Sequence, residues 1–308
     1  MIINTGMRTD IPAFYSKWFM NRIKEGYVLV RNPYNPSSVT RYDLNPNVVD
    51  LIAFCTKNPE PMLDYIEELR NFNQFWFVTI TPYGRDIEPN VPDKENIIEA
   101  FKQLSDKVSS DCTVWRYDPI FITKKYSIDF HINAFEKMAH RLAGYTHTCI
   151  ISFIDIYQKV IKNFPQAKEV SRDEQTEIVK AFFDIAEKYN IKIKACAEDS
   201  RLEQYGIDCG GCMTIEAFEN ALKFKLNAPK SKPSRANCAC YLSSDIGAYD
   251  TCTHFCKYCY ANSNHVAVLN NIKKHNPDSP FLIGEEMHGD KIIVAKQESW
   301  IDNQLTIF

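Results

Sequence analysis

The chain has 308 residues and a mass of 35.6 kDa, and 45% of its residues are hydrophobic and 24% are charged. These proportions are those of a globular protein, and they exclude a disordered, collagen-like or low-complexity chain. The formal net charge of -3 supplies no overall field that would attract nucleic acid or anionic lipid. No run approaches the roughly 18 apolar residues of a membrane span and no secretory signal opens the chain, so we expect a cytoplasmic protein with no membrane partner.

Short β-branched and aromatic runs alternate with longer amphipathic stretches, which is the rhythm of a parallel sheet with helical crossovers. The expected strands are Ile2–Asn4, Val49–Phe54, Phe75–Ile80, Thr113–Arg116, Thr148–Phe153 and Lys192–Cys196. The expected helices are Ala13–Lys24, Pro61–Phe72, Glu95–Val108, Ile128–Leu142 and Asp173–Tyr189. Six such repeats predict an α/β fold built as a partial (β/α)6 TIM-like barrel, with a doubly wound open sheet as the alternative.

The rhythm breaks after residue 200, where cysteine, glycine and polar residues replace it. We therefore expect three parts. Residues 1–200 form the partial barrel, residues 201–264 form a cysteine-rich region that binds an iron–sulfur cluster, and residues 265–308 form a C-terminal tail that packs on the barrel.

Polar side chains follow each expected strand, where parallel βα folds bind their ligands. The residues that we expect to contact a cofactor or substrate are Arg8, Asp10, Lys57, Asn58, Ser152 and Glu198. A basic and an acidic group at one strand end also form structural ion pairs, so the functional interpretation depends on all the strand ends meeting at one edge.

The sequence WRYDP at residues 115–119 is the most distinctive of these strand ends. Arg116 offers a planar guanidinium that can hold a carboxylate or phosphate through two hydrogen bonds. Tyr117 and Asp118 can position or transfer a proton, so we expect these three residues to be catalytic. The alternative is that Arg116 and Asp118 neutralise each other inside the fold.

Cysteine is the most informative residue type, because seven of the 11 cysteines lie between residues 209 and 259. In a chain without a secretory signal, such clustering favours metal ligation over disulfides. Cys252, Cys256 and Cys259 form a C-x3-C-x2-C motif within CTHFCKYCY. Three thiolates on one loop can each bind one iron of a [4Fe–4S] cluster and leave the fourth iron open. A zinc knuckle and a loop of buried thiols are the alternatives.

The motif resembles that of the radical S-adenosylmethionine (radical SAM) superfamily, in which an aromatic residue accompanies the cysteines, as Tyr258 and Tyr260 do here. The resemblance implies that the open iron chelates SAM and that one-electron reduction yields a 5'-deoxyadenosyl radical. It therefore implies an enzyme with an unidentified substrate and an electron donor such as a flavodoxin or ferredoxin.

The chain from residue 2 to its end also resembles the bacterial family named domain of unknown function DUF1848. The segments that carry this resemblance are MRTDIPAFYSKWFMNRIKEGY, RNPYNP, TKNPEPML, WRYDPI, ISFIDIY and CACYLSSDIGAYDTCTHFCKYCYAN. The family implies a radical-SAM-like cysteine motif on the C-terminal side of the barrel, and no particular reaction. Cys55 stands where the family usually has an aromatic residue, and Cys209 looks additional.

Four further cysteines supply a second tetrathiolate set, namely Cys209, Cys212, Cys238 and Cys240. Such a set can hold a second [4Fe–4S] cluster or a structural zinc ion. Cys196, at the end of the sixth expected strand, is a substitute for Cys209 in this set. The remaining interpretation is that some of these residues are plain buried thiols.

Two rival functions follow from other features. A nucleic-acid-acting protein similar to spore photoproduct lyase is suggested by the basic residues Lys225, Lys230, Lys232 and Arg235 and by the aromatic residues Phe14, Tyr15, Trp18 and Phe19. The other alternative is a non-catalytic protein whose fold is stabilised by iron–sulfur or zinc sites. Nucleic acid is the less favoured partner, because the net charge is slightly acidic.

Overall fold

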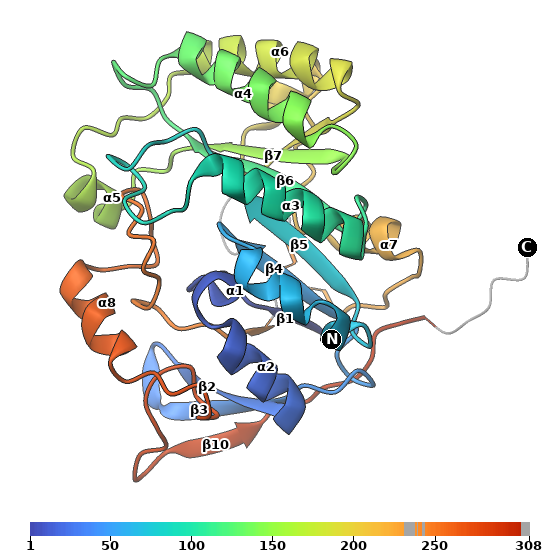
Figure 1. Cartoon of the computed structure of the whole chain (residues 1–308), viewed down its shortest axis with the longest axis vertical. Helices are drawn as coiled ribbons and strands as arrows, with labels where there is room; N and C mark the ends of the chain where they lie inside the picture. Colours follow the sequence, from blue (N-terminus) through green and yellow to red (C-terminus); the bar gives the residue numbers. More distant parts are fainter. Residues whose placement is uncertain (231–237, 239, 242–243, 303–308) are drawn as a thin grey trace, which may run out of the picture.

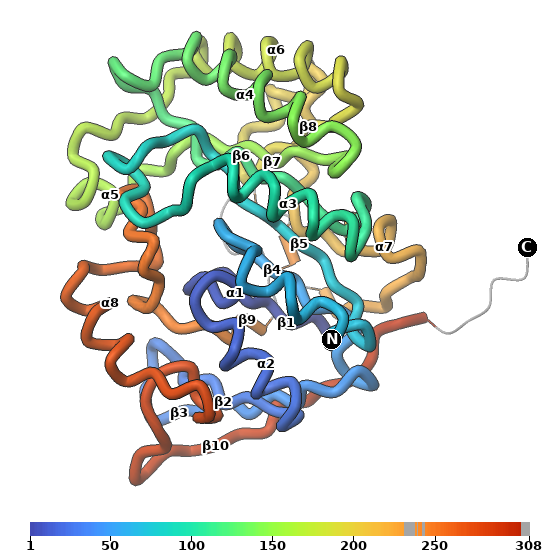
Figure 2. The backbone as a smooth tube through the Cα atoms, in the orientation of Figure 1, coloured from blue at the N-terminus to red at the C-terminus, as the bar shows by residue number. Residues whose placement is uncertain are grey.

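The computed structural model describes residues 1–230, 238, 240–241 and 244–302. A parallel seven-stranded sheet runs through the middle of the molecule in the order β8-β7-β6-β5-β4-β1-β9 (Figures 1 and 2). Its strands are β1 (Ile2–Asn4), β4 (Leu51–Thr56), β5 (Gln74–Thr79), β6 (Thr113–Ile120), β7 (Thr148–Phe153), β8 (Lys192–Ala195) and β9 (Ser244–Asp245). Six of them coincide with the expected strands to within a few residues, so the fold is mixed α/β with a parallel sheet.

The strand order runs from β4 to β8 without a reversal, and β1 adjoins β4. A doubly wound sheet has a point at which the order reverses, so that alternative is wrong for this chain. Among the described residues, β8 and β9 lie at opposite ends of the order, and the strand pairings do not close the sheet into a barrel.

Most helices follow the strands as crossovers. The α-helices are α1 (Ile11–Phe14), α2 (Ser16–Glu25), α3 (Lys94–Val108), α4 (Ile128–Leu142), α5 (Gln158–Asn163), α6 (Arg172–Lys188), α7 (Ile215–Leu222) and α8 (His265–Ile272). The 3-10 helices are η1 (Glu60–Tyr65), η2 (Glu67–Leu69) and η3 (Ser200–Tyr205). The caps agree with the sequence, since the Ser171 hydroxyl accepts from the Glu174 amide and the Glu174 carboxylate accepts from the Ser171 amide.

Two expected helices take another form. The stretch expected as Ala13–Lys24 is divided at Tyr15, whose φ of -131° leaves the helical region. The Tyr15 hydroxyl donates to the Thr251 carbonyl at 2.7 Å, which anchors this break to a distant segment. The stretch expected as Pro61–Phe72 forms η1 and η2 in place of one α-helix.

The two faces of the sheet carry different cores. Alternate strand residues such as Ile3, Phe54 and Trp115 pack against helices α2, α3, α4 and α6. The residues between them, such as Ala53 and Phe77, face a second core that includes α7 and several cysteines. Because side chains alternate along a strand, each residue's position in the sheet decides which core it enters. We call the second face the cysteine face.

A second sheet of three strands lies beside α2 at the bottom of Figure 1. It consists of β2 (Tyr27–Asn32), β3 (Asn35–Asp43) and β10 (Lys291–Val294). β2 and β3 form an antiparallel hairpin, and β10 pairs parallel to β3. Neither the hairpin nor β10 was expected from the sequence.

The C-terminal segment returns to the start of the main sheet. The Trp300 amide and the Ser299 hydroxyl both donate to the Asp50 carboxylate, at 2.8 and 2.5 Å. Asp50 is buried immediately before β4, so these bonds fasten residues 299–300 to the amino end of that strand. None of the helices in the described part of the chain has the length and apolar character needed to cross a bilayer.

Candidate functional site

The three cysteines of the C-x3-C-x2-C motif lie on one loop, residues 252–259, which we call the three-cysteine loop. It precedes α8 and runs beside α5 on the left of Figure 1, where the Lys159 ammonium donates to the Tyr260 carbonyl at 2.8 Å. On its other side, the Lys257 amide donates to the Ile87 carbonyl at 3.0 Å. Ile87 follows β5, so the loop is held at the carboxyl edge of the sheet.

The three thiols share one electrostatic environment. Burial raises the pKa of the Cys252 thiol, and Asp10, Cys259 and Cys256 raise it further. Cys252 is buried, while Cys256 and Cys259 are partly buried. The three sulfurs are therefore near enough to repel one another as thiolates, and a bound cation would relieve that repulsion.

Glu88 joins the three-cysteine loop to the sheet. Its buried carboxylate accepts hydrogen bonds from Lys57 at 2.8 Å, from the Thr81 hydroxyl at 2.7 Å, and from Lys94 and the Tyr258 hydroxyl. Burial alone would raise the pKa of Glu88, but the two lysines lower it to about 2, so the group is a carboxylate at neutral pH.

Lys57 connects this carboxylate to the thiols. Burial lowers the pKa of Lys57, but Glu88, Cys256 and Asp118 act in the opposite direction, and its pKa is raised overall. Lys57 and Lys94 share the single Glu88 carboxylate, so the lysine charge exceeds the charge of that carboxylate. This arrangement favours an anionic group at Cys256.

Asp10 and His254 form a second connection. The Asp10 carboxylate caps α1 through the Ala13 amide and also accepts from the Lys57 amide at 2.7 Å. Its Oδ2 lies 3.0 Å from Nε2 of His254, which is buried and belongs to the three-cysteine loop. Asp10 therefore connects the residues that follow β1, the residues that follow β4 and the three-cysteine loop.

Buried polar atoms without hydrogen-bond partners are concentrated in this part of the structure. Among the described residues, such atoms include both amide atoms of Asn4, the Thr9 hydroxyl, Nδ1 of His254 and Oδ1 of Asn262. Asn4 ends β1, Thr9 follows it, and His254 and Asn262 lie in or just after the three-cysteine loop. Because buried polar groups are normally hydrogen-bonded, this concentration makes the surroundings of the loop the candidate ligand site.

The WRYDP residues divide between the two faces of the sheet. Arg116 forms an ion pair with Asp118, which was the structural alternative for these residues, and both are partly buried. Arg116 and Cys55 also contribute to the pKa of Tyr260, so this strand end and the three-cysteine loop belong to one electrostatic neighbourhood. Tyr117 lies on the helix-covered face, where its hydroxyl is 2.8 Å from Nδ1 of His131.

The remaining expected contact residues serve mainly local structure. Arg8 pairs with Asp245 of β9 at 2.8 Å, and Asn58 accepts from the Glu60 amide at 3.3 Å in the turn before η1. Glu198 accepts from the Phe153 amide at 2.8 Å and thereby closes the end of β7. Ser152 lies two residues after Ile150, which places it on the cysteine face.

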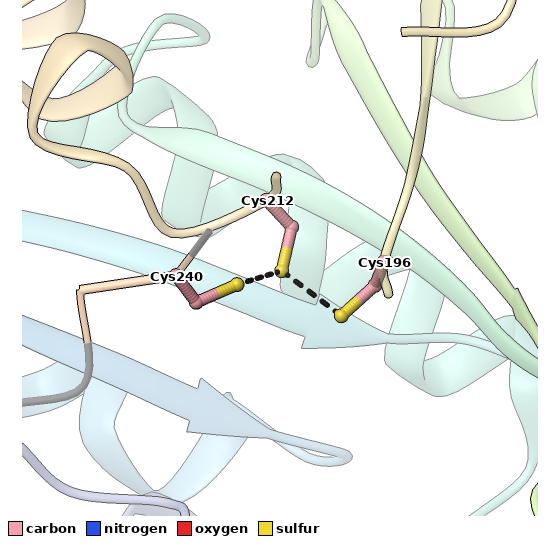
Figure 3. Close-up of side chains that lie close together, drawn as sticks. All are labelled: Cys196, Cys212 and Cys240. Carbon is pink, nitrogen blue, oxygen red and sulfur yellow. Dashed lines mark hydrogen bonds between the residues drawn. The ribbon is translucent and has the colours of Figure 1, made fainter. Parts of the chain in front are cut away.

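In the second cysteine set, the structure groups Cys196, the stated substitute for Cys209, with Cys212 and Cys240. Cys196, Cys212 and Cys240 have sulfur atoms that all lie within 4.8 Å of one another, and Figure 3 shows these sulfurs pointing towards one another. Cys209 instead contacts the Asp199 carbonyl at 3.6 Å. Cys238 is buried and packs in the same core.

The sequence did not point to Glu88, Lys94 or Asp245. Glu88 pairs with the expected residue Lys57 and with Lys94, and Asp245 pairs with the expected residue Arg8. Glu88 lies well after β5 in the segment before α3, and Lys94 is the first residue of α3, so neither is among the first residues after the strand. The detectable signal was a charged residue within the otherwise weakly polar stretch IEPNVP, residues 87–92. Examining whole loops at the carboxyl edge would have found it.

The chain belongs to the family named domain of unknown function DUF1848, whose model matches residues 2–261. A comparison with curated proteins finds no significant match. Among solved structures, the chain is similar to a Bacteroides thetaiotaomicron VPI-5482 protein described as an alpha-L-fucosidase, with 10% identity and a TM-score of 0.33. That similarity covers 57% of this chain and 67% of the other.

Proposed function

We propose that the protein is an iron–sulfur enzyme of the radical SAM class that acts on an unidentified substrate. The observation that carries this proposal is the concentration of unpartnered buried polar atoms around a loop with three thiols. The spacing of Cys252, Cys256 and Cys259 suits three of the four irons of a [4Fe–4S] cluster. Such a cluster, with its fourth iron open, supplies the single electron that cleaves bound SAM.

The charges around the loop fit an anionic cluster. Three thiolates lower the net charge of a bound cluster. Burial raises the pKa of the Cys256 and Cys259 thiols, and Lys57, which lies beside them, acts against this rise at both. We therefore assign Lys57 and Lys94 the role of stabilising the charge of the loaded loop, and Asp10 and His254 the role of holding its backbone.

Substrate recognition is proposed for the strand ends that neighbour the loop. Cys55 is partly buried, and its pKa is raised to about 12 by burial, with Arg116, Asp245 and Asp10 as the nearest charges. The unpartnered amide of Asn4 offers both a donor and an acceptor at the same sheet edge. Asn4, Cys55 and Arg116 are the residues that we propose to contact SAM or substrate.

We further propose that the sheet curls as a partial (β/α)6 barrel. The support is the strand order, since β1 and β4 to β8 follow one another without reversal and each pairs parallel to the next. In a barrel the carboxyl ends of all strands surround one opening, which suits a site shared by β1, β4 and β6.

The test is SAM cleavage by the full chain, purified and reconstituted with iron and sulfide without oxygen and then reduced with dithionite. We expect 5'-deoxyadenosine and methionine to be released, and the Cys256→Ala variant to release neither. Cys112→Ala is the matched control, because Cys112 is a buried thiol before β6 at the opposite edge. An iron-loaded, reduced wild-type protein that leaves SAM intact would overturn the proposal.

The nucleic-acid alternative receives no specific support from the described residues. Tyr15, Trp18 and Phe19 are buried core residues, so of the proposed aromatic stripe Phe14 alone is exposed. Lys225 pairs with Glu219 at 2.8 Å. Lys232 and Arg235 lie outside the residues that the structure describes. The electron donor stays a proposal, with a small redox protein such as a flavodoxin or ferredoxin as its class.

A further inference from the structure

A compact group of three thiols occupies the cysteine face, apart from the three-cysteine loop. Cys196 directly follows β8, Cys212 lies between η3 and α7, and Cys240 precedes β9. The Sγ atom of Cys212 lies 3.2 Å from that of Cys196 and 3.1 Å from that of Cys240 (Figure 3). These separations exceed the roughly 2.05 Å of a disulfide bond, so the three cysteines are not joined by disulfides.

The spacing of these sulfurs is nearer to that of the ligands of one metal ion than to that of the ligands of a cluster. Thiolates bound at about 2.3 Å to one tetrahedral ion lie roughly 3.8 Å apart. The ligands of an iron–sulfur cube bind different irons, so their sulfurs stand farther apart than those of one ion. Across the described residues, the sulfurs of Cys196, Cys212 and Cys240 all lie within 4.8 Å of one another. The three sulfurs of the three-cysteine loop do not all lie that close together.

The surroundings of the group suit a metal-bound thiolate cluster. Its three cysteines are buried among apolar side chains such as Phe77 and Phe218. Arg116 lies on the same face, and Asp118, Cys212 and Cys196 outweigh the effect of burial on its pKa, which is raised. Three thiolates and one divalent ion carry a net negative charge, and Arg116, which is also paired with Asp118, brings a cation to this face.

The connectivity gives the group a structural purpose. β8 and β9 lie at opposite ends of the main sheet, and the described residues Cys212, Phe218 and Cys240 of the crossing between them pack on the cysteine face. Cys240 lies on this crossing, and the Tyr241 amide donates to the Met213 carbonyl at 2.6 Å, which holds the crossing beside Cys212. An ion bound here would fix the position of β9, whose Asp245 binds Arg8.

We propose that Cys196, Cys212 and Cys240 together bind one thiophilic divalent ion of the zinc class, and that Cys209 is not a ligand. The ion links Cys240, on the segment that crosses to β9, to the end of β8. This site is separate from the proposed iron–sulfur loop. The zinc content of the site and the cleavage of SAM at the loop can therefore be measured independently.

The test measures zinc and iron in the full chain, purified without oxygen, for the wild type and four single variants. We expect about one zinc ion per wild-type chain and at least a tenfold loss of zinc in Cys196→Ser and Cys212→Ser, with iron unchanged. Cys209→Ser is the matched control and keeps its zinc. Cys256→Ser also keeps its zinc and loses iron.

Two results would overturn the proposal. One is a Cys212→Ser variant that loses iron and has no zinc to lose, which would make the group an auxiliary cluster site. The other is zinc that persists in both Cys196→Ser and Cys212→Ser. Cobalt substitution of the Cys256→Ser protein keeps the test valid if the other variants fail to fold. We expect an intense thiolate-to-cobalt absorption that saturates near one equivalent, and its absence would contradict the site.

Discussion

Nζ of Lys57 lies 2.8 Å from Oε1 of Glu88, and the same carboxylate oxygen accepts the hydroxyl hydrogen of Tyr258. Three separate parts of the chain meet in this contact, because Lys57 directly follows β4, Glu88 lies between β5 and α3, and Tyr258 belongs to the three-cysteine loop. The position of the loop on the sheet therefore depends on a carboxylate that lies about 170 residues before it in sequence.

Replacing this carboxylate should destabilise the whole chain and loosen the loop. Glu88→Gln removes a buried carboxylate and leaves the partly buried ammonium groups of Lys57 and Lys94 without their counter-charge. Removing one partner of a buried ion pair typically costs about 3–5 kcal/mol. We expect a decrease of that size in the free energy of unfolding, measured by urea denaturation, and a lower iron content after reconstitution.

Asp86→Asn provides the control for this variant, because Asp86 lies two residues away and pairs with Lys125 at 2.9 Å. Both side chains of that pair are exposed, so its loss should change the unfolding free energy by less than about 1 kcal/mol. Equal effects of the two substitutions would contradict the role that we assign to Glu88.

His131 makes the stability of the protein depend on pH. It is buried between the Tyr117 hydroxyl and the Phe121 carbonyl, at 2.8 and 2.9 Å, and burial lowers its pKa to about 4. Between about pH 4 and 6.5 the unfolded chain binds the proton and the folded chain does not, so stability falls as the pH falls through this range. The total loss is about 3 kcal/mol.

The measurement compares urea unfolding of the wild type and His131→Gln at several pH values from 4 to 8. The carboxylates titrate in both proteins, so the difference between them isolates the imidazole. We expect the stability of the variant to vary less with pH between 4 and 6.5. Parallel curves for the two proteins over this range would show that the folded imidazole titrates normally.

The six βα units could be predicted because each strand is a short β-branched or aromatic run, bounded by polar residues. The β2–β3 hairpin carried a comparable signal, since the run YVLVRN ends at the turn-favouring Asn32 and is followed by Pro33. It was missed because a hairpin interrupts the βα rhythm that guided the prediction. β10 could not be predicted, because its residues Ile292–Val294 are exposed and their pairing with β3 depends on tertiary structure.

The candidate site was predictable in its residue types and less so in its grouping. Spacing alone identifies Cys252, Cys256 and Cys259 as a set. The sequence left the choice between Cys196 and Cys209 open, because that choice depends on where β8 ends relative to a segment more than 40 residues later. Tyr117 was predicted to join Arg116, but neighbouring residues in a strand point to opposite faces.

The stacked rings of Phe135 and Phe182 hold α4 and α6 together on the sheet. Their centroids are 3.8 Å apart and their planes are 11° from parallel, and Phe135 also stacks on Trp115 of β6. Phe135 is fully buried, so Phe135→Ala should lower the unfolding free energy by about 3–5 kcal/mol. Phe14→Ala is the control, because Phe14 is 36% exposed, and a comparable loss there would contradict this prediction.

Cys209 should behave as a slow, unligated thiol. Burial and the neighbouring acidic groups Glu203 and Asp208 raise its pKa to about 11. Only the thiolate is alkylated, so the rate of its reaction with iodoacetamide should rise about tenfold per pH unit beyond pH 8.5, where an ordinary cysteine levels off. Mass spectrometry of the peptide that contains Cys209 measures this rate.

Because Cys209 is not a ligand in our proposal, complete modification should leave the zinc content unchanged. A rate that levels off near pH 8.5 would refute the raised pKa, and release of zinc in step with alkylation would place Cys209 among the metal ligands.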